Sequence, residues 1–146
     1  DWSDNRLIPD CVRSWNKEKA AKIRNPKSTR PWQHVLEVTY GYLLLAKTIK
    51  KNKKLHGESF NFGPNMKQNF KVIDILKKSK LFWKNVKWNL EKKDLFKENI
   101  LLNLNNSKVK KVIGWKPSLN FEETIKLTIE WYKTFSLKNK KLIKIK

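Results

Sequence analysis

Apolar residues recur at helical spacing in five parts of the chain, and each part predicts a helix. The predicted helices cover 7–15, 35–50, 72–81, 107–113 and 121–135. Gly114 ends the fourth of them, and Pro117 prevents its continuation. The helix at 35–50 carries an apolar stripe that Leu43 and Leu44 widen. This helix should therefore be buried on more than one side.

Four short apolar stretches between these helices predict strands. They cover 21–24, 59–62, 86–90 and 100–104. Asn25-Pro26 stops the first strand, and Gly63-Pro64-Asn65 is a turn signal after the second. Helices that alternate with short strands predict the α/β or the α+β class. The elements lie too close together for a complete doubly wound dinucleotide-binding domain, which would use roughly twice this length.

Polar residues at the helix starts predict how two helices are capped. Ser3 or Asp4 is expected to cap the first helix. Asn120 and Glu123 have the spacing of a capping box at the start of the last one. After this helix, the Lys-rich tail at 137–146 should be frayed from position 138.

The charge of the chain is strongly positive, with 34 Lys and Arg against 13 Asp and Glu, a net charge of +21. Such an excess is typical of proteins that bind nucleic acid. Here the lysines are spread over nearly every predicted element, which favours solvated faces, and no known nucleic-acid-binding motif is present. The arginines all lie within the first 30 residues: Arg6, Arg13, Arg24 and Arg30. Because only Arg offers phosphate a planar, two-pronged donor, an anion site is expected in this segment.

The single cysteine, Cys11, excludes an internal disulfide and a zinc site built on cysteines. Its place in an apolar helical stretch predicts a core residue, not a nucleophile. His34 has no second His nearby, so no metal site is expected. No apolar run reaches the roughly 18 residues of a membrane span. We therefore expect a cytoplasmic protein with no membrane partner.

Several short motifs follow one another in the order and spacing of a known family. They are Asp1-Trp2-Ser3-Asp4-Asn5-Arg6-Leu7-Ile8-Pro9-Asp10, Ile23-Arg24-Asn25-Pro26, Arg30-Pro31-Trp32-Gln33-His34-Val35-Leu36-Glu37, Gly41-Tyr42-Leu43-Leu44-Leu45-Ala46, Asn61-Phe62-Gly63-Pro64-Asn65, Gly114-Trp115-Lys116-Pro117 and Trp131-Tyr132. Together they resemble the C-terminal portion of the CDP-glucose 4,6-dehydratases, nucleotide-sugar dehydratases of the extended short-chain dehydrogenase/reductase superfamily. The resemblance extends to about residue 135, and its Arg-Pro-Trp-Gln-His-Val run is fairly specific for the CDP-glucose branch.

The resemblance implies part of a fold in which a dinucleotide-binding (Rossmann) domain is joined to a smaller, discontinuous substrate lobe. In that fold, 1–34 would be a substrate-lobe segment, and 35–63 would be a helix and strand that pack on the dinucleotide-binding domain. Residues 64–136 would return to the substrate lobe. The complete Rossmann domain is missing from this sequence, and a segment that carries it should precede Asp1.

The function implied by the resemblance is that of the substrate-binding portion of an NAD-dependent lyase. The family converts CDP-glucose to CDP-4-keto-6-deoxyglucose and water, and its members are commonly homodimers. This chain has neither the Gly-rich turn that binds NAD nor a Tyr-x-x-x-Lys pair, since Leu44, Ala46 and Ser136 stand four positions after its tyrosines. The chain alone should be inactive and should bind no NAD.

Nine positions are candidates for substrate binding, most of them because they match the family's motifs. They are Arg30, Arg6, Leu7, Ile23, Arg24, His34, Asn65, Asn69 and Glu98. Arg30 is the first choice, because a guanidinium suits a diphosphate. Lys97 and Asn105 depart from the family, which has His and Asp at these positions. A related sugar-nucleotide epimerase, a truncated binding protein without chemistry and a basic nucleic-acid-binding module remain alternatives.

Overall fold

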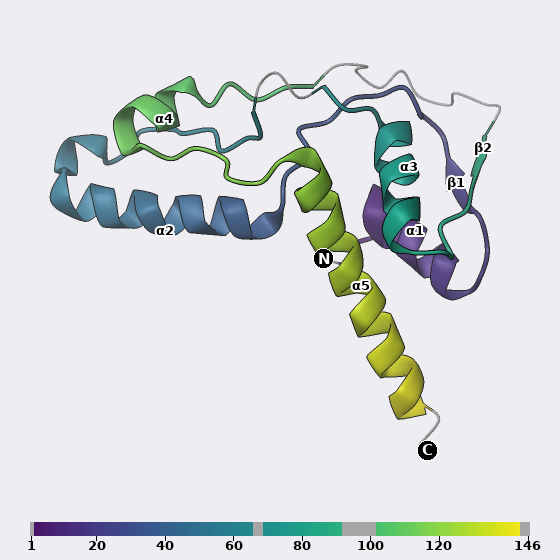
Figure 1. Ribbon diagram of the computed structural model, residues 1–146. Helices are drawn as coiled ribbons and strands as arrows, with labels where there is room; N and C mark the ends of the chain where they lie inside the picture. The colour runs from purple at the N-terminus through teal and green to yellow at the C-terminus, as the bar shows by residue number, and fades with distance from the viewer. Residues whose placement is uncertain (1, 66–68, 92–101, 144–146) are drawn as a thin grey trace.

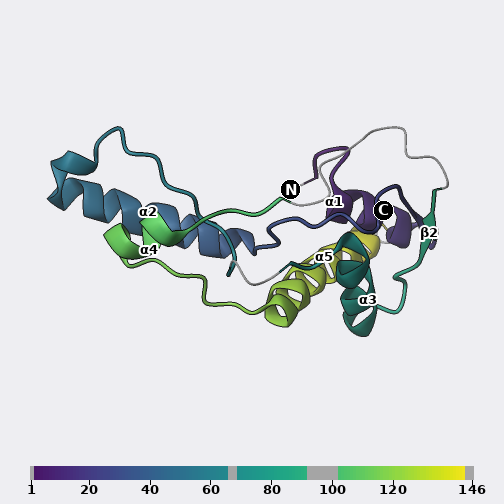
Figure 2. The same ribbon diagram turned by 90° about the horizontal axis from the view of Figure 1, so that it is seen from above.

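The computed structural model describes residues 2–65, 69–91 and 102–143, with side chains as far as 137. The elements in chain order are α1 (Leu7–Asn16), β1 (Ala21–Ile23), α2 (Val35–Lys51), the 3-10 turn η1 (Lys53–Leu55), α3 (Val72–Phe82), β2 (Trp88–Leu90), α4 (Ser107–Ile113) and α5 (Phe121–Ile143). Figures 1 and 2 show α2 and α4 together on one side, and α1, α3 and the two strands on the other. The predicted mixture of helices and strands is confirmed.

The five predicted helices form close to their predicted positions. The capping box before α5 also forms: the Asn120 N–H donates to the Glu123 carboxylate at 2.8 Å, and the Glu123 N–H donates to Asn120 Oδ1 at 3.0 Å. The prediction of a tail frayed from 138 is wrong for 138–143, whose backbone is helical. Three of its six residues are Lys, which has a high intrinsic helix propensity.

The start of α1 differs from the prediction, because neither Ser3 nor Asp4 caps this helix. The N-cap is Arg6, and no side chain accepts a hydrogen bond from the first turn. Asp4 instead forms an ion pair with Arg13, at 3.0 Å. The first N–H groups of α1, at Leu7 and Ile8, therefore have no side-chain cap.

The strands β1 and β2 form a parallel two-stranded sheet, with Ala21 paired to Trp88 and Ile23 to Leu90. The two other predicted strands are wrong for 59–62 and for 102–104, the described part of 100–104. A strand needs a backbone partner, and in the described part of the chain no second sheet supplies one. Phe62 lies instead in a small core with Val109 and Trp115.

The main hydrophobic core lies between α1, α3, α5 and the sheet. Its largest fully buried side chain is Trp15, whose Nε1 donates to the Lys87 carbonyl oxygen at 2.9 Å. Trp32 packs at the edge of this core and donates from Nε1 to the Phe70 carbonyl oxygen at 2.9 Å. The long loop after β1 is therefore fixed to the segment before α3.

Burial of α2 on more than one side stays a prediction for a protein that includes the dinucleotide-binding domain, and this chain alone covers one side of the helix. Only Glu37 and Gly41 of this helix are buried, while Val35, Leu36 and Leu43 are 69%, 66% and 67% exposed. The inner face meets Phe62 and α4, but nothing in the described part of the chain covers the outer face. None of the described helices has both the length and the apolar character needed to cross a membrane.

Candidate functional site

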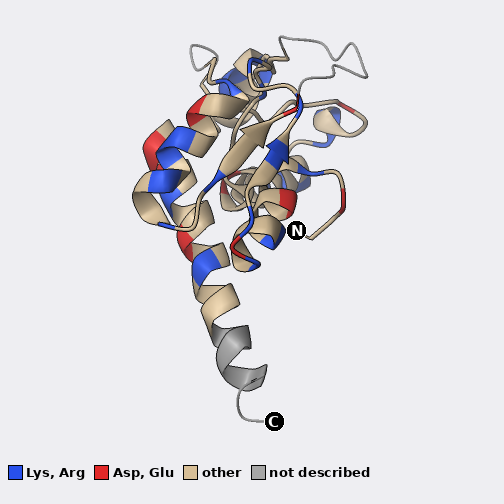
Figure 3. Ribbon diagram, turned by 90° about the vertical axis from the view of Figure 1, so that its right-hand side faces the viewer, with Lys and Arg blue, Asp and Glu red and all other residues tan. Residues whose placement is uncertain are grey.

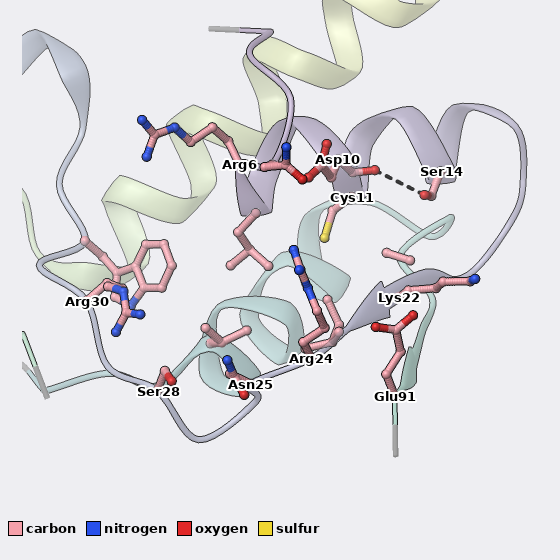
Figure 4. Close-up of a pocket in the computed structure, with 16 residues that line it drawn as sticks. Arg6, Asp10, Cys11, Ser14, Lys22, Arg24, Asn25, Ser28, Arg30 and Glu91 are labelled. Carbon is pink, nitrogen blue, oxygen red and sulfur yellow. Dashed lines mark hydrogen bonds between the residues drawn. The ribbon is translucent and has the colours of Figure 1, made fainter. Parts of the chain in front are cut away.

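A cleft of about 760 Å³ opens between the first half of α1, the end of β1 and the loop that follows β1 (Figure 4). It is lined by Asn5, Arg6, Leu7, Asp10, Cys11, Ser14, Ala21, Lys22, Ile23, Arg24, Asn25, Ser28, Arg30, Trp32, Val72 and Glu91. The described segment 5–32 thus supplies nearly all of the lining.

One face of α1 forms a wall of the cleft. Leu7, Asp10, Cys11 and Ser14 follow the spacing i, i+3, i+4 and i+7, which brings residues of a helix to the same side. Ser14 Oγ donates to the Asp10 carbonyl oxygen at 3.1 Å, so this hydroxyl is held against the helix backbone. The wall is mixed in character, because the apolar Leu7 and Cys11 alternate with the polar Asp10 and Ser14.

The floor of the cleft is formed where the two parallel strands end. Ile23 is buried at the end of β1, and Arg24 and Asn25 follow it into the cleft. The Glu91 N–H, one residue beyond β2, donates to the Ile23 carbonyl oxygen at 2.9 Å. Parallel strands that end side by side form the edge at which α/β proteins bind ligands.

The cleft is electropositive, because Arg6, Lys22, Arg24 and Arg30 outnumber its two carboxylates. One of these carboxylates, on Asp10, is paired with the guanidinium of Arg13. In the view of Figure 4, Arg6 and Arg30 lie towards one end of the cleft and Lys22 towards the other, with Arg24 between them. This arrangement suits an elongated anion.

The arginines differ in how firmly they are held. Arg30 is half-buried, and its Nη1 donates to the Thr29 carbonyl oxygen at 2.7 Å. Arg6 and Arg24 are exposed, and no described residue accepts a hydrogen bond or ion pair from their guanidinium groups. Arg30 is thus fixed in place, while Arg6 and Arg24 keep all their donors for a ligand.

Five of the nine predicted site residues line this cleft: Arg6, Leu7, Ile23, Arg24 and Arg30. His34 does not line it. His34 is the N-cap of α2, where its Nδ1 accepts a hydrogen bond from the Leu36 N–H at 3.3 Å.

Asn65 and Asn69, the other described residues of the nine, also lie outside the cleft lining. Both are exposed, on either side of 66–68 and before α3. Glu98 and Lys97 lie outside the described residues. Asn105 accepts a hydrogen bond at Oδ1 from the Ser107 N–H at 2.9 Å, so it holds the start of α4.

Sequence reasoning missed several polar residues of the lining. They are Asp10, Ser14, Lys22, Asn25, Ser28 and Glu91. The helical spacing from Leu7 was a signal that could have found Asp10 and Ser14. No local signal marks Glu91, because it reaches the cleft only through the pairing of β2 with β1.

Cys11 is almost fully buried at the cleft wall, as predicted. Burial, with a smaller contribution from the charge of Asp10, raises the pKa of its thiol from 9.0 to about 12. A thiol with this pKa is protonated at neutral pH and does not act as a nucleophile. Among the described residues, no group of His, Cys, Asp and Glu is arranged to hold a metal ion.

The described residues do not fit a dinucleotide cofactor. The cleft contains no glycine, and the two-stranded sheet is too small to form a dinucleotide crevice. Basic residues are scattered over several helices and loops, with acidic residues among them, on the side shown in Figure 3. That side is not the continuous basic stripe expected of a nucleic-acid-binding protein.

The amino-acid sequence is 35% identical over 136 residues to CDP-glucose 4,6-dehydratase of Salmonella typhimurium. The aligned region covers 92% of this chain and 38% of that enzyme, so the chain spans less than half the length of its relative. No family model matches the sequence.

Solved structures of low sequence identity share the fold. UDP-glucuronic acid 4-epimerase from Bacillus cereus, in complex with UDP-glucuronic acid and NAD, has a TM-score of 0.75 at 15% identity, covering 90% of this chain and 40% of that one. An epimerase from Methanothermobacter thermautotrophicus also has a TM-score of 0.75, at 17% identity, covering 97% of this chain and 40% of that one. dTDP-glucose 4,6-dehydratase from Bacillus anthracis, in complex with NAD, has a TM-score of 0.65 at 18% identity, covering 88% of this chain and 39% of that one. The chain is therefore similar in sequence to a part of CDP-glucose 4,6-dehydratase, and its fold is that of a part of the extended short-chain dehydrogenase/reductase enzymes that include sugar-nucleotide epimerases and dehydratases.

Proposed function

We propose that this chain is the substrate-binding portion of a nucleotide-sugar dehydratase, and that its cleft binds the nucleoside diphosphate of CDP-glucose. The observation that carries the proposal is the convergence of Arg6, Arg24 and Arg30 on one cleft. A diphosphate offers several anionic oxygens in a row, and guanidinium groups bind such oxygens in pairs. The 35% identity to CDP-glucose 4,6-dehydratase supports the choice of nucleotide sugar.

The backbone adds to the anion site. The N-terminus of α1 lies at the cleft with no side-chain cap, so the N–H groups of Leu7 and Ile8 keep their hydrogen-bonding capacity. Such groups, with the helix dipole behind them, attract phosphate oxygens. Arg6 stands at this N-terminus, so its side chain and the backbone would bind the same group.

The complete protein would convert CDP-glucose to CDP-4-keto-6-deoxyglucose and water. Residues outside this chain would hold NAD, which would supply reversible hydride transfer. The residues of this chain would bind and orient the nucleotide, and the chain alone would be inactive. We also propose that segment 35–63 packs on a dinucleotide-binding domain, which the exposed apolar face of α2 supports.

Calorimetric titration with CDP-glucose tests this proposal. The wild-type chain should bind it saturably, and Arg30→Ala should weaken binding about 10- to 100-fold through the loss of a charge-assisted pair. The affinity of Arg30→Lys should lie between those of the wild type and Arg30→Ala, because Lys keeps the positive charge but not the two-pronged donor geometry of Arg. Lys111→Ala, an exposed charge on α4, should leave the affinity unchanged.

The same titration with an unrelated oligonucleotide at two salt concentrations tests the nucleic-acid alternative. The absence of CDP-glucose binding by a folded chain would contradict the proposal. Tight oligonucleotide binding that weakens steeply with salt would then favour a nucleic-acid-binding protein.

A further inference from the structure

We infer that the carboxylate of Glu91 selects a cytosine base over a uracil base in this cleft, an inference that rests on the proposed function. Glu91 follows β2 directly, and its N–H donates to the Ile23 carbonyl oxygen at 2.9 Å. This bond continues the parallel pairing of the two strands and fixes the backbone of Glu91 at the cleft floor. The Cα atom of Glu91 therefore has a fixed position at the cleft, and its exposed side chain extends from there.

The two ends of the cleft differ chemically. Arg6 and Arg30 lie towards one end in the view of Figure 4, whereas Glu91 and Lys22 lie towards the other. A nucleoside diphosphate has its negative charge at one end and a polar, uncharged base at the other. With the diphosphate at the arginines, the base would reach the end that holds Glu91 and Lys22.

Glu91 is the cleft carboxylate that remains available to a base. Asp10, the other acid in the lining, is already paired with Arg13. In the described part of the chain no hydrogen bond or ion pair engages the side chain of Glu91. An ionised carboxylate can only accept hydrogen bonds, so it needs a donor from its ligand.

Cytosine and uracil differ at C4, where a carboxylate can distinguish them by hydrogen bonding. Cytosine presents an amino group at C4, which donates hydrogen bonds, and uracil, like thymine, presents a carbonyl oxygen there. A carboxylate binds the amino group and repels the carbonyl oxygen. Lys22 can donate to the O2 oxygen that both bases share, so it gives affinity without discrimination.

The test is calorimetric titration of the chain with CDP and with UDP, which carry the same diphosphate. The wild type should bind CDP about tenfold more tightly than UDP, the discrimination expected of one charge-assisted hydrogen bond. Glu91→Gln should bring the two affinities close together, because an amide can donate to the uracil oxygen as well as accept from the cytosine amino group. The matched control, Glu130→Gln on the exposed face of α5, should keep the wild-type ratio.

The outcomes separate this inference from the proposed function. If both nucleotides bind but their ratio is the same in the wild type and in Glu91→Gln, the cleft is a nucleotide site and the inference about Glu91 is overturned. If the folded wild type binds neither nucleotide, the proposed function fails and the inference fails with it. Because the side chain of Glu91 is exposed, the variant should fold like the wild type, which far-ultraviolet circular dichroism checks.

Discussion

The four arginines of this chain have two different roles in the structure. Arg13 is neutralised, since it pairs with Asp4 and Asp10 and donates to the Trp2 carbonyl oxygen at 2.8 Å. The other three line the cleft, where their positive charge is not balanced by the carboxylates. The position of the arginines in the sequence therefore pointed to the segment that lines the cleft, although it did not separate Arg13 from the rest. That separation depends on which acids the fold places nearby.

Cys11 gives a prediction at the scale of one residue. With a pKa of about 12, only about one part in 10,000 of its thiol is ionised at pH 8, against about a tenth for a thiol at its ordinary pKa of 9.0. Alkylation by iodoacetamide at pH 8 should therefore be about 1,000-fold slower in the folded chain than in urea. Similar rates in the two states would contradict the prediction. Ser107→Cys in a Cys11→Ser background, an exposed control, should react at nearly equal rates.

The same pKa shift predicts a pH dependence of stability. Burial favours the neutral thiol, so the folded chain binds this proton more tightly than the unfolded chain does. The contribution of Cys11 to the free energy of unfolding is therefore fully present below pH 9 and is lost as the pH rises towards 12. Urea denaturation at pH 8 and pH 10 should show a smaller loss of stability in Cys11→Ser than in the wild type.

At the scale of elements, a buried carboxylate joins α2 to the segment before α5. Glu37 Oε1 accepts hydrogen bonds from the backbone N–H groups of Ser118 and Leu119, the latter at 2.8 Å. Together with His34 at the N-cap of α2 and Trp32 on the Phe70 carbonyl, it gives the Arg-Pro-Trp-Gln-His-Val-Leu-Glu motif a largely structural role beyond Arg30. A motif that resembles a functional signature of the family therefore also holds helices and loops of the fold together.

The contact between α2 and the small core depends on Gly41. A Cβ atom at this position would clash with Phe62 Cδ1, because the two atoms would lie far closer than their van der Waals contact distance. It would also lie 3.1 Å from Trp115 Nε1. Gly41→Ala should therefore lower the free energy of unfolding by about 1–3 kcal/mol, as overpacking does. Urea denaturation followed by tryptophan fluorescence measures this.

A double-mutant cycle provides the control for that prediction. Phe62→Leu removes ring atoms from the site of the clash, so Gly41→Ala should cost less in this background than in the wild type. Equal costs in the two backgrounds would show that the loss arises elsewhere in α2, and would contradict the packing explanation.

The elements themselves differ in how far local pattern predicts them. Helices form from hydrogen bonds within one segment, so the spacing of apolar residues located all five of them. Strands need partners distant in sequence. The segments 21–24 and 86–90 find each other across about 65 residues, whereas 59–62 has an apolar strand pattern and no partner in the described part of the chain.

At the scale of the whole molecule, the outer face of α2 exposes apolar side chains to solvent. Leu36, Tyr40 and Leu43 follow helical spacing along this face, and all three are more than half exposed. Such an apolar stripe favours association with a matching surface. In isolation, the chain should therefore self-associate as its concentration rises.

Sedimentation equilibrium checks this prediction. The double variant Leu36→Lys, Leu43→Lys should remain monomeric at concentrations at which the wild type associates. Leu127→Lys, a control that places the same charge on an exposed leucine of α5, should associate like the wild type. A monomeric wild type at all concentrations would contradict the prediction.

The sequence by itself determined the positions of the helices, the mixture of helices and strands, and the two segments that form the sheet. These features depend mainly on local spacing and on the chemistry of single residues, so the order of residues along the chain is enough to predict them. The tertiary structure alone decided that Glu91 joins the cleft and that His34 caps a helix outside it. Each of these depends on which distant segments meet, because strand pairing and burial are properties of contacts between segments.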